Sequence, residues 1–185
     1  MMACADDDQD KDKEKDENKP KPICPQVVIV RELDRISDYG TESPDPTQLV
    51  AKALMNNVNG DCAYQKDGID IAFDLTMVAV RGPRLGGNHV SLPYFIAVAD
   101  PDHKILQKEL MTADFHISND EKTVEKTESL HVVIPVAKDK TDTGPNYQVL
   151  LGFQLTEEQI KAVREKEDVQ FPEPTAPPAG LEKQK

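Results

Sequence analysis

The feature that most constrains the fold is a stretch of regular alternation between residues 69 and 77. Every second position carries a large apolar side chain, with mostly polar side chains between; the apolar set is Ile69, Ile71, Phe73, Leu75 and Met77. A β-strand repeats every two residues, so this pattern places the apolar side chains on one face. The segment therefore predicts a half-buried strand, which needs a second layer to cover that face.

A turn sequence just before this stretch predicts a β-hairpin. Lys66-Asp67-Gly68 contains a D-G pair, which is typical of tight hairpin turns. We therefore expect residues 57–64 to pair antiparallel with residues 69–80. Residues 49–55 contain good helix formers but precede turn-favouring residues. We interpret them as a strand, or a strand with a bulge, and the helical alternative stays open.

A second hairpin is predicted around the sequence Asp100-Pro101-Asp102-His103. The apolar run 94–99 leads into it, and residues 104–106 run out again. Its proline presets the φ angle of a turn, and its first aspartate can accept hydrogen bonds from the following backbone amides. His103 then falls where a left-handed backbone conformation is expected, a mildly strained choice for a residue other than glycine.

Other segments complete an all-β pattern. Short apolar runs predict three further strands, at residues 23–30, 131–136 and 147–153. Gly and Pro residues predict a loop at 34–46, and a helix is expected after Thr156, which forms a capping box with Gln159. The fold class that these elements favour is all-β, an immunoglobulin-like antiparallel β-sandwich with one short C-terminal helix.

The two ends of the chain differ in composition from the middle. Residues 1–22 are dominated by Asp, Glu and Lys, and residues 168–185 are rich in proline. Neither segment carries enough apolar surface to offset the entropy of ordering a chain, so both are expected to be disordered. The prediction is one folded domain, residues 23–167, between an acidic tether and a Pro-rich tail.

Charge and hydropathy exclude several classes of function. The formal net charge of −12 argues against non-specific nucleic-acid binding, which needs Lys and Arg. No stretch approaches the length of apolar sequence that a membrane-spanning helix requires. The apolar region of a complete signal peptide is also missing.

The first four residues, Met1-Met2-Ala3-Cys4, resemble the end of a bacterial lipobox. In bacterial lipoproteins the cysteine of this motif becomes the new N-terminus and carries acyl chains, which implies that Cys4 is a lipid anchor. Met1 stands where leucine is usual, and the upstream basic and apolar regions are missing; a start upstream of Met1 explains both departures. A free cytosolic thiol at a frayed chain end is the alternative that stays open.

The rest of the chain resembles small, uncharacterised proteobacterial lipoproteins with a single sandwich domain. Besides Cys4, the resemblance rests on four motifs: Cys24-Pro25, Gly60-Asp61-Cys62, Leu92 to Val98 and Gly152 to Thr156. These motifs are structural and not catalytic. The resemblance implies an envelope location facing the periplasm, with the outer membrane favoured over the inner, and it implies no reaction.

Two cysteines form an even pair once Cys4 is set aside. Cys24 and Cys62 fall in separate predicted strands, and in an oxidising compartment such a pair commonly forms a disulfide. In the chain-entropy account, closing a loop of this length stabilises a fold by roughly 3–4 kcal/mol. Two buried free thiols in a cytosolic protein are the alternative.

No motif identifies a metal site or a catalytic centre. The four histidines, His89, His103, His116 and His131, have no ligand spacing, and the acidic run has Lys11 where a calcium loop requires glycine. Nucleophile-elbow, zinc-protease and Walker motifs are absent. We therefore expect no catalytic residue, no metal and no cofactor, and histidines that are exposed bystanders unless folding gathers them into a cluster.

These observations favour a non-enzymatic cell-envelope lipoprotein that is attached to the membrane by a lipid anchor and contacts another envelope protein. Two alternatives stay open. One is a periplasmic metal-binding protein that uses the acidic run and the histidines, and the other is a cytosolic interaction domain if the start at Met1 is correct. The partner or small-molecule ligand, the membrane leaflet and the oligomeric state do not follow from the sequence.

Overall fold

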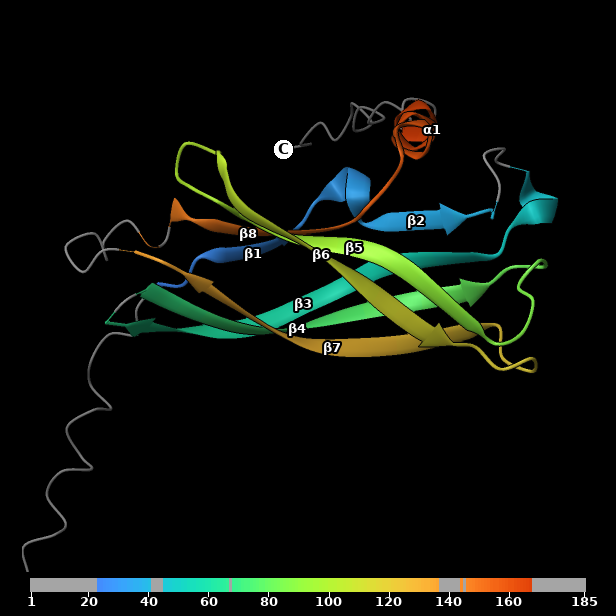
Figure 1. Cartoon of the computed structure of the whole chain (residues 1–185), viewed down its shortest axis with the longest axis horizontal. Helices are drawn as coiled ribbons and strands as arrows, with labels where there is room; N and C mark the ends of the chain where they lie inside the picture. The colour runs from blue at the N-terminus through green and yellow to red at the C-terminus, as the bar shows by residue number, and fades with distance from the viewer. Residues whose placement is uncertain (1–22, 41–44, 67, 137–143, 145, 168–185) are drawn as a thin grey trace, which may run out of the picture.

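Two four-stranded β-sheets pack face to face in the computed structural model (Figure 1). The structure describes residues 23–40, 45–66, 68–136, 144 and 146–167. Its strands are β1 (Gln26–Ile29), β2 (Arg35–Asp38), β3 (Ala51–Gln65), β4 (Gly68–Arg81), β5 (His89–Ala99), β6 (Ile105–His116), β7 (Thr123–Ile134) and β8 (Gln148–Phe153). Its helices are the 3₁₀ turns η1 (Arg31–Leu33) and η2 (Pro46–Gln48) and the α-helix α1 (Glu157–Glu167).

This architecture confirms the predicted fold class, an all-β sandwich of mainly antiparallel strands with one short C-terminal helix. The predicted disordered ends, residues 1–22 and 168–185, lie outside the described residues. The sheets have the strand orders β1-β8-β5-β6 and β2-β3-β4-β7. Neighbouring strands are antiparallel, except that β1 and β8 run parallel at one edge. A strand from the end of the domain therefore holds the first strand in its sheet.

The β3–β4 hairpin forms as its turn sequence predicts. The two strands pair from Gln65↔Gly68 at the turn to Ala51↔Arg81 at the far end. A β-bulge shifts the register after Met55, so residues 51–55 belong to a strand with a bulge and not to a helix. β7 pairs along the other side of β4 and makes it a central strand of its sheet.

The core is the apolar layer between the sheets. The alternating side chains of β4 are all at most 3% exposed: Ile69, Ile71, Phe73, Leu75 and Met77. They share one buried cluster with side chains of β5, β6 and β8: Leu92, Tyr94, Phe115, Leu151 and Phe153 among others. Burying one such side chain contributes about 1.5–3 kcal/mol, so this layer is the main source of stability.

Some strand residues lie where the sequence did not predict a strand. β2 lies inside the predicted loop 34–46, which is therefore wrong at residues 35–38; pairing with β3 and one buried side chain, Ile36, hold this strand. Residues 107–116 and 123–130 extend β6 and β7 well beyond the predicted segments. Both are edge strands whose side chains are largely exposed, so little apolar alternation marks them.

The turn between β5 and β6 has the predicted chemistry. The Asp100 carboxylate accepts hydrogen bonds from the backbone N–H groups of Asp102 (3.0 Å) and Lys104 (2.9 Å). His103 has a φ angle of 63°, which is the left-handed conformation expected at that position. Both features of the predicted turn are confirmed.

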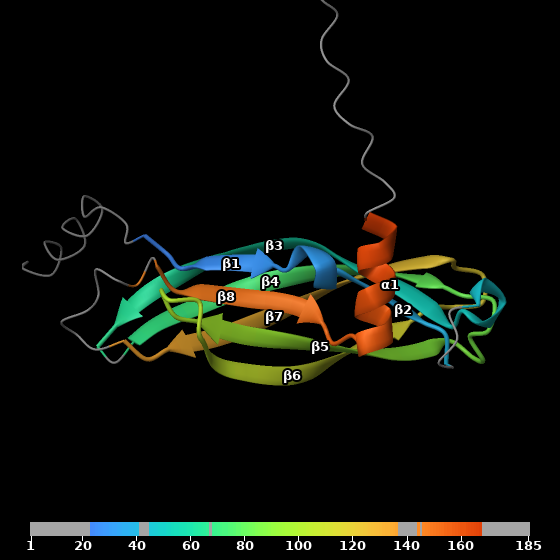
Figure 2. The same ribbon diagram turned by 90° about the horizontal axis from the view of Figure 1, so that it is seen from above.

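The helix α1 begins with the predicted capping box. The N–H of Gln159 donates to Thr156 Oγ1 (3.3 Å), and the N–H of Thr156 donates to Gln159 Oε1 (2.9 Å). The Gln159 amide also donates to the carbonyl oxygen of Ser37 (3.0 Å), and Arg164 pairs with Glu32 (2.9 Å). These contacts fix the helix to β2 and η1, and Figure 2 shows it crossing the direction of the strands.

One end of the sandwich is closed by Arg81, the last residue of β4. Its guanidinium donates to the carbonyl oxygens of Ile117 (2.9 Å), Leu85 (3.1 Å) and Gly87 (2.6 Å) and to the side chain of Asn119 (3.0 Å). These acceptors belong to the β4–β5 loop and the β6–β7 loop. One side chain therefore ties both loops together, which the five donors of a guanidinium allow.

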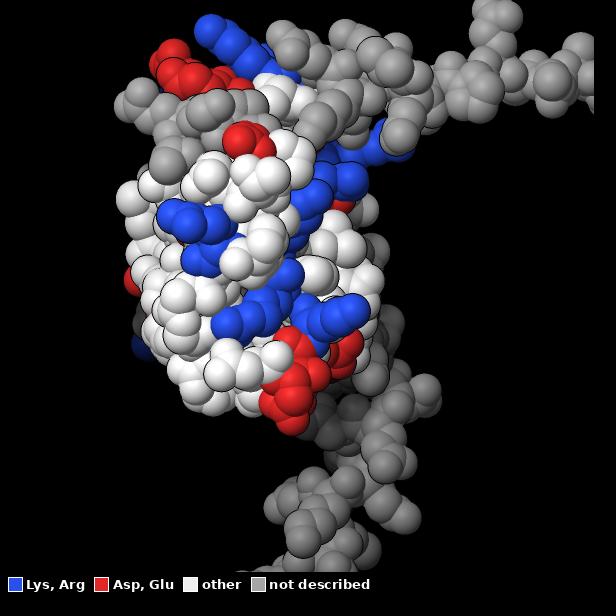
Figure 3. Space-filling view, turned by 90° about the vertical axis from the view of Figure 1, so that its right-hand side faces the viewer, with Lys and Arg blue, Asp and Glu red and all other residues white. Residues whose placement is uncertain are grey.

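Basic side chains gather at this end of an otherwise acidic protein (Figure 3). The Arg81 N–H donates to the Lys122 carbonyl (2.8 Å), and the Arg84 N–H donates to the Leu49 carbonyl (3.0 Å). Lys52 lies on β3, one position along from the residue that pairs with Arg81. We call Lys52, Arg81, Arg84 and Lys122 the basic end.

Replacing Leu75 with alanine is expected to lower the free energy of unfolding by about 2–5 kcal/mol, because it leaves a cavity between the sheets. Leu75 is 0% exposed, whereas Val80 on the same strand is 40% exposed. Val80→Ala is therefore the matched control, with an expected cost below about 1 kcal/mol. Urea denaturation measures both variants, and equal losses would contradict the burial of this face of β4.

Candidate functional site

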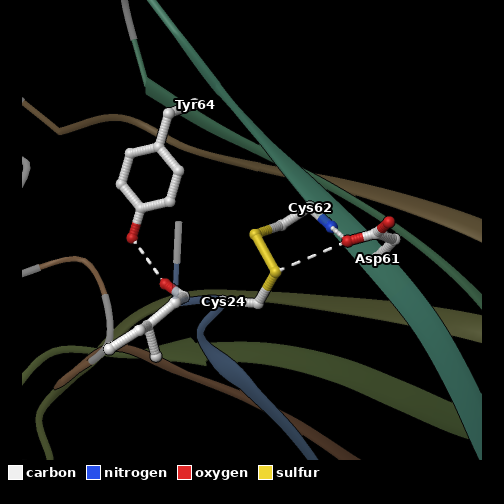
Figure 4. Close-up of a disulfide and its surroundings, with 5 residues drawn as sticks. Cys24, Asp61, Cys62 and Tyr64 are labelled. Carbon is white, nitrogen blue, oxygen red and sulfur yellow. Dashed lines mark hydrogen bonds between the residues drawn. A yellow bond between two sulfur atoms is a disulfide. The ribbon is translucent and has the colours of Figure 1, made fainter. Parts of the chain in front are cut away.

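The predicted disulfide partners meet at the end of the sandwich opposite the basic end (Figures 1 and 4). The Sγ atoms of Cys24 and Cys62 lie 2.08 Å apart, at disulfide bonding distance, and their Cα atoms are 5.7 Å apart. Cys24 precedes β1 of one sheet, and Cys62 belongs to β3 of the other. The bond therefore joins the start of the described chain to the opposite sheet. Cys4, the predicted lipid anchor, lies outside the described residues.

Two neighbouring side chains reinforce this junction. The Tyr64 hydroxyl donates to the carbonyl oxygen of Ile23 at 2.8 Å, and burial raises the pKa of that phenol above its ordinary value. The Asp61 carboxylate accepts from the N–H of Cys62 (2.8 Å), and its Oδ1 lies 3.7 Å from Cys24 Sγ. The first described residues are thus held to β3 by a covalent bond and a hydrogen bond (Figure 4).

A cavity of about 250 Å³ lies beside the disulfide. Its lining residues are Cys24, Pro25, Val27, Val58, Asn59, Gly60, Asp61 and Ile71. Sites for small molecules usually measure about 300–1,000 Å³ and carry several convergent polar groups. This cavity has one carboxylate and one amide side chain, which do not supply a nucleophile with its own base.

The same residues bring three possible metal donors together. One donor atom each from Cys24, Asp61 and Cys62 lies within 4.8 Å of the other two. A cysteine binds metal as a free thiolate, and both sulfurs are in a disulfide here. In the oxidised protein this cluster is therefore a structural junction and not a metal site.

Folding separates the four histidines into three places. His103 lies on the β5–β6 turn, and His131 on β7 contacts the carboxylate of Asp70. His89 and His116, by contrast, lie directly opposite each other on β5 and β6. His89 and His116 are therefore cross-strand neighbours, although far apart in the sequence.

A polar contact inside the core was not predicted. Tyr94 on β5 is fully buried, and its hydroxyl donates to Glu128 Oε2 on β7 at 2.5 Å. Lys126 pairs with the other oxygen of this carboxylate at 2.7 Å. Burial, followed by the hydrogen bond to Glu128, raises the pKa of Tyr94 far above its ordinary value. One sequence feature could have indicated this contact. Tyr94 stands within an apolar run, and a buried tyrosine hydroxyl usually has a hydrogen-bond partner.

Comparisons with known proteins add no assignment. The chain matches no family model, no curated protein and no solved structure. Among the described residues, no helix is long and apolar enough to cross a membrane. Function therefore has to be inferred from the arrangement of residues.

Replacing both bonded cysteines, Cys24→Ala together with Cys62→Ala, is expected to lower the free energy of unfolding by roughly 3–4 kcal/mol. The reason is that the bond closes a loop between residues 38 positions apart. Cys4→Ala serves as the control and should change stability by less than about 0.5 kcal/mol. Urea denaturation without reductant measures all three proteins, and a double variant as stable as the parent would show that the bond adds nothing to the fold.

The Tyr94 contact predicts a stability that falls at alkaline pH. Above the ordinary pKa of 10.0 the unfolded chain loses the phenolic proton, whereas the folded protein retains it because its pKa is raised. The unfolded state then binds fewer protons, so the free energy of unfolding decreases, at most by about 1.4 kcal/mol per pH unit for this group. Urea denaturation between pH 8 and about 11.5 should show a shallower decrease for Tyr94→Phe, and identical slopes would be inconsistent with the buried contact.

Proposed function

We propose that this protein is a non-enzymatic lipoprotein of the bacterial cell envelope, facing the periplasm and anchored through Cys4, with the outer membrane favoured over the inner. The sandwich would be held off the membrane by residues 5–22 and would act by contact with another envelope protein. The observation that carries the proposal is the Cys24–Cys62 bond at the point where this segment joins the domain.

The position of this bond suits a junction that bears load. Without it, a pull on residue 23 would act on β1, a strand of four residues at the edge of its sheet. With it, the pull passes to β3, a strand of 15 residues that pairs with β2 on one side and β4 on the other. The hydrogen bond from Tyr64 to Ile23 acts at the same point. Such a connection suits a domain that is held by its N-terminal segment.

The bond between Cys24 and Cys62 also supports an envelope location. Disulfides persist in oxidising compartments such as the bacterial periplasm and are rare in the reducing cytosol. Residues 5–22 carry eight acidic side chains and five lysines, and as a tether they would span up to about 60 Å at full stretch. That reach is enough to separate a small domain from a lipid surface.

The fold sets which end would face a partner. The chain enters at the disulfide end, and the basic end lies at the other end of the long axis (Figure 1). An anchored sandwich would therefore present the basic end away from its attachment. Lys52, Arg84 and Lys122 are exposed there. Exposed Asp120 and Glu121 adjoin Lys122, so charge complementarity favours an acidic surface on the partner only opposite Lys52 and Arg84.

The mature N-terminus tests the proposal. We expect mass spectrometry of protein extracted with detergent from its source organism to show a chain that begins at Cys4 and carries acyl groups. Cys4→Ser should move the protein from the membrane fraction to the soluble fraction, whereas Cys24→Ser should leave the acylation unchanged. An unmodified Cys4 preceded by Met1-Met2-Ala3 would overturn the proposal and favour the cytosolic interaction domain.

A further inference from the structure

The β5–β6 hairpin brings two histidines together near the basic end. His89 and His116 are directly opposite in the register of β5 and β6. The N–H of Ile117 donates to the carbonyl of Asn88 at 2.7 Å, one position outside this pair. That placement makes His89↔His116 a non-hydrogen-bonded antiparallel pair, the kind whose side chains lie closest, with Cβ atoms about 4.5–5.5 Å apart.

A carboxylate lies on the same face, two residues along. Ser91↔Asp114 is the next pair whose side chains point the same way as the histidines, and the Ser91 hydroxyl donates to Asp114 at 2.5 Å. Asp114 Oδ1 is 4.0 Å from His89 Nε2. The other imidazole, of His116, has its Nε2 3.3 Å from the amide nitrogen of Asn88. Two imidazoles and one carboxylate therefore share a small area of the sheet surface.

All three side chains lie on the surface of the sheet. The side chains of His89 and Asp114 are 59% and 56% exposed, and His116 is also exposed. In the structure His116 Nε2 contacts the Asn88 amide and Asp114 accepts from Ser91, so binding a shared ion would exchange these contacts and turn the two imidazoles about their Cα–Cβ bonds. The backbone of the pair is held by the β5–β6 ladder, which runs from His89 to Ala99, and β8 pairs with β5 only from Tyr94 onward.

We propose that His89, His116 and Asp114 form a surface site for one divalent transition-metal ion. Imidazole and carboxylate donors suit Zn²⁺, Ni²⁺ and Cu²⁺ and not Ca²⁺ or Mg²⁺, which prefer oxygen donors alone. The two imidazoles supply the first ligands, Asp114 supplies the third or orients His89, and water completes the shell. Cu²⁺ binds most tightly at a site of nitrogen and oxygen donors, so it is the first ion to test. The site does not depend on the lipid anchor.

The chain contains its own controls. His103 is alone on a turn, and His131 pairs with Asp70 on the other sheet. Neither has a second histidine opposite it in the register. Losing either of them should leave metal binding unchanged, whereas losing either member of the His89–His116 pair should remove the site.

Calorimetric titration of the full chain with CuSO₄ and with ZnCl₂ tests the site. The protein carries Cys4→Ser, so that a free thiol does not compete, and no reductant is added, so that Cys24 and Cys62 stay bonded. We expect one ion per chain at micromolar or lower Kd for Cu²⁺. His89→Ala or His116→Ala should weaken binding at least tenfold, and Asp114→Asn about 10-fold. His103→Ala and His131→Ala should stay within twofold.

Proton NMR gives a second measurement, which does not rely on the heat of binding. Sub-stoichiometric Cu²⁺ is paramagnetic and should broaden the imidazole signals of His89 and His116 before those of His103 and His131. No binding below 1 mM, or equal losses in the control variants, would overturn the proposed site. Circular dichroism of each variant checks that the sandwich is folded.

Discussion

The structure depends on the closure of two sheets over one apolar layer. β4 supplies a complete apolar face at the centre of one sheet, and side chains of β5, β6 and β8 complete the layer from the other. Because this layer fills the interior, the groups that bear chemistry are displaced to the ends and the outer surfaces. Between the sheets, the Tyr94 hydroxyl is satisfied by a direct hydrogen bond to Glu128. A core of this kind provides a rigid platform.

The polar and charged groups differ between the two ends of the sandwich. At one end a disulfide and a tyrosine hydrogen bond fasten the entering chain to β3, the long strand of the opposite sheet. At the other end Arg81 ties two loops together, with basic side chains and the His89–His116 pair nearby. The disulfide end, where the described chain begins, and the proposed metal site therefore lie at opposite ends of the long axis.

Local patterns allowed much of the fold to be predicted, and non-local pairing explains the rest. The alternation of residues 69–77, the Asp100 turn and the Thr156 capping box each act within a few residues, and each is confirmed. β2 and the outer parts of β6 and β7 are held by backbone pairing with distant strands, so their composition does not mark them. The His89–His116 pair joins residues far apart in sequence, which ligand spacing along the chain does not detect.

The central claim is that the sandwich is fastened to its tether by a disulfide in an oxidising compartment. The most direct measurement is alkylation of thiols in cells of the source organism after rapid acid quenching, followed by mass spectrometry of the peptides that contain Cys24 and Cys62. The account predicts that both cysteines escape alkylation until a reductant is added. Complete alkylation of both before reduction would contradict it, because the junction would then be open where the protein works.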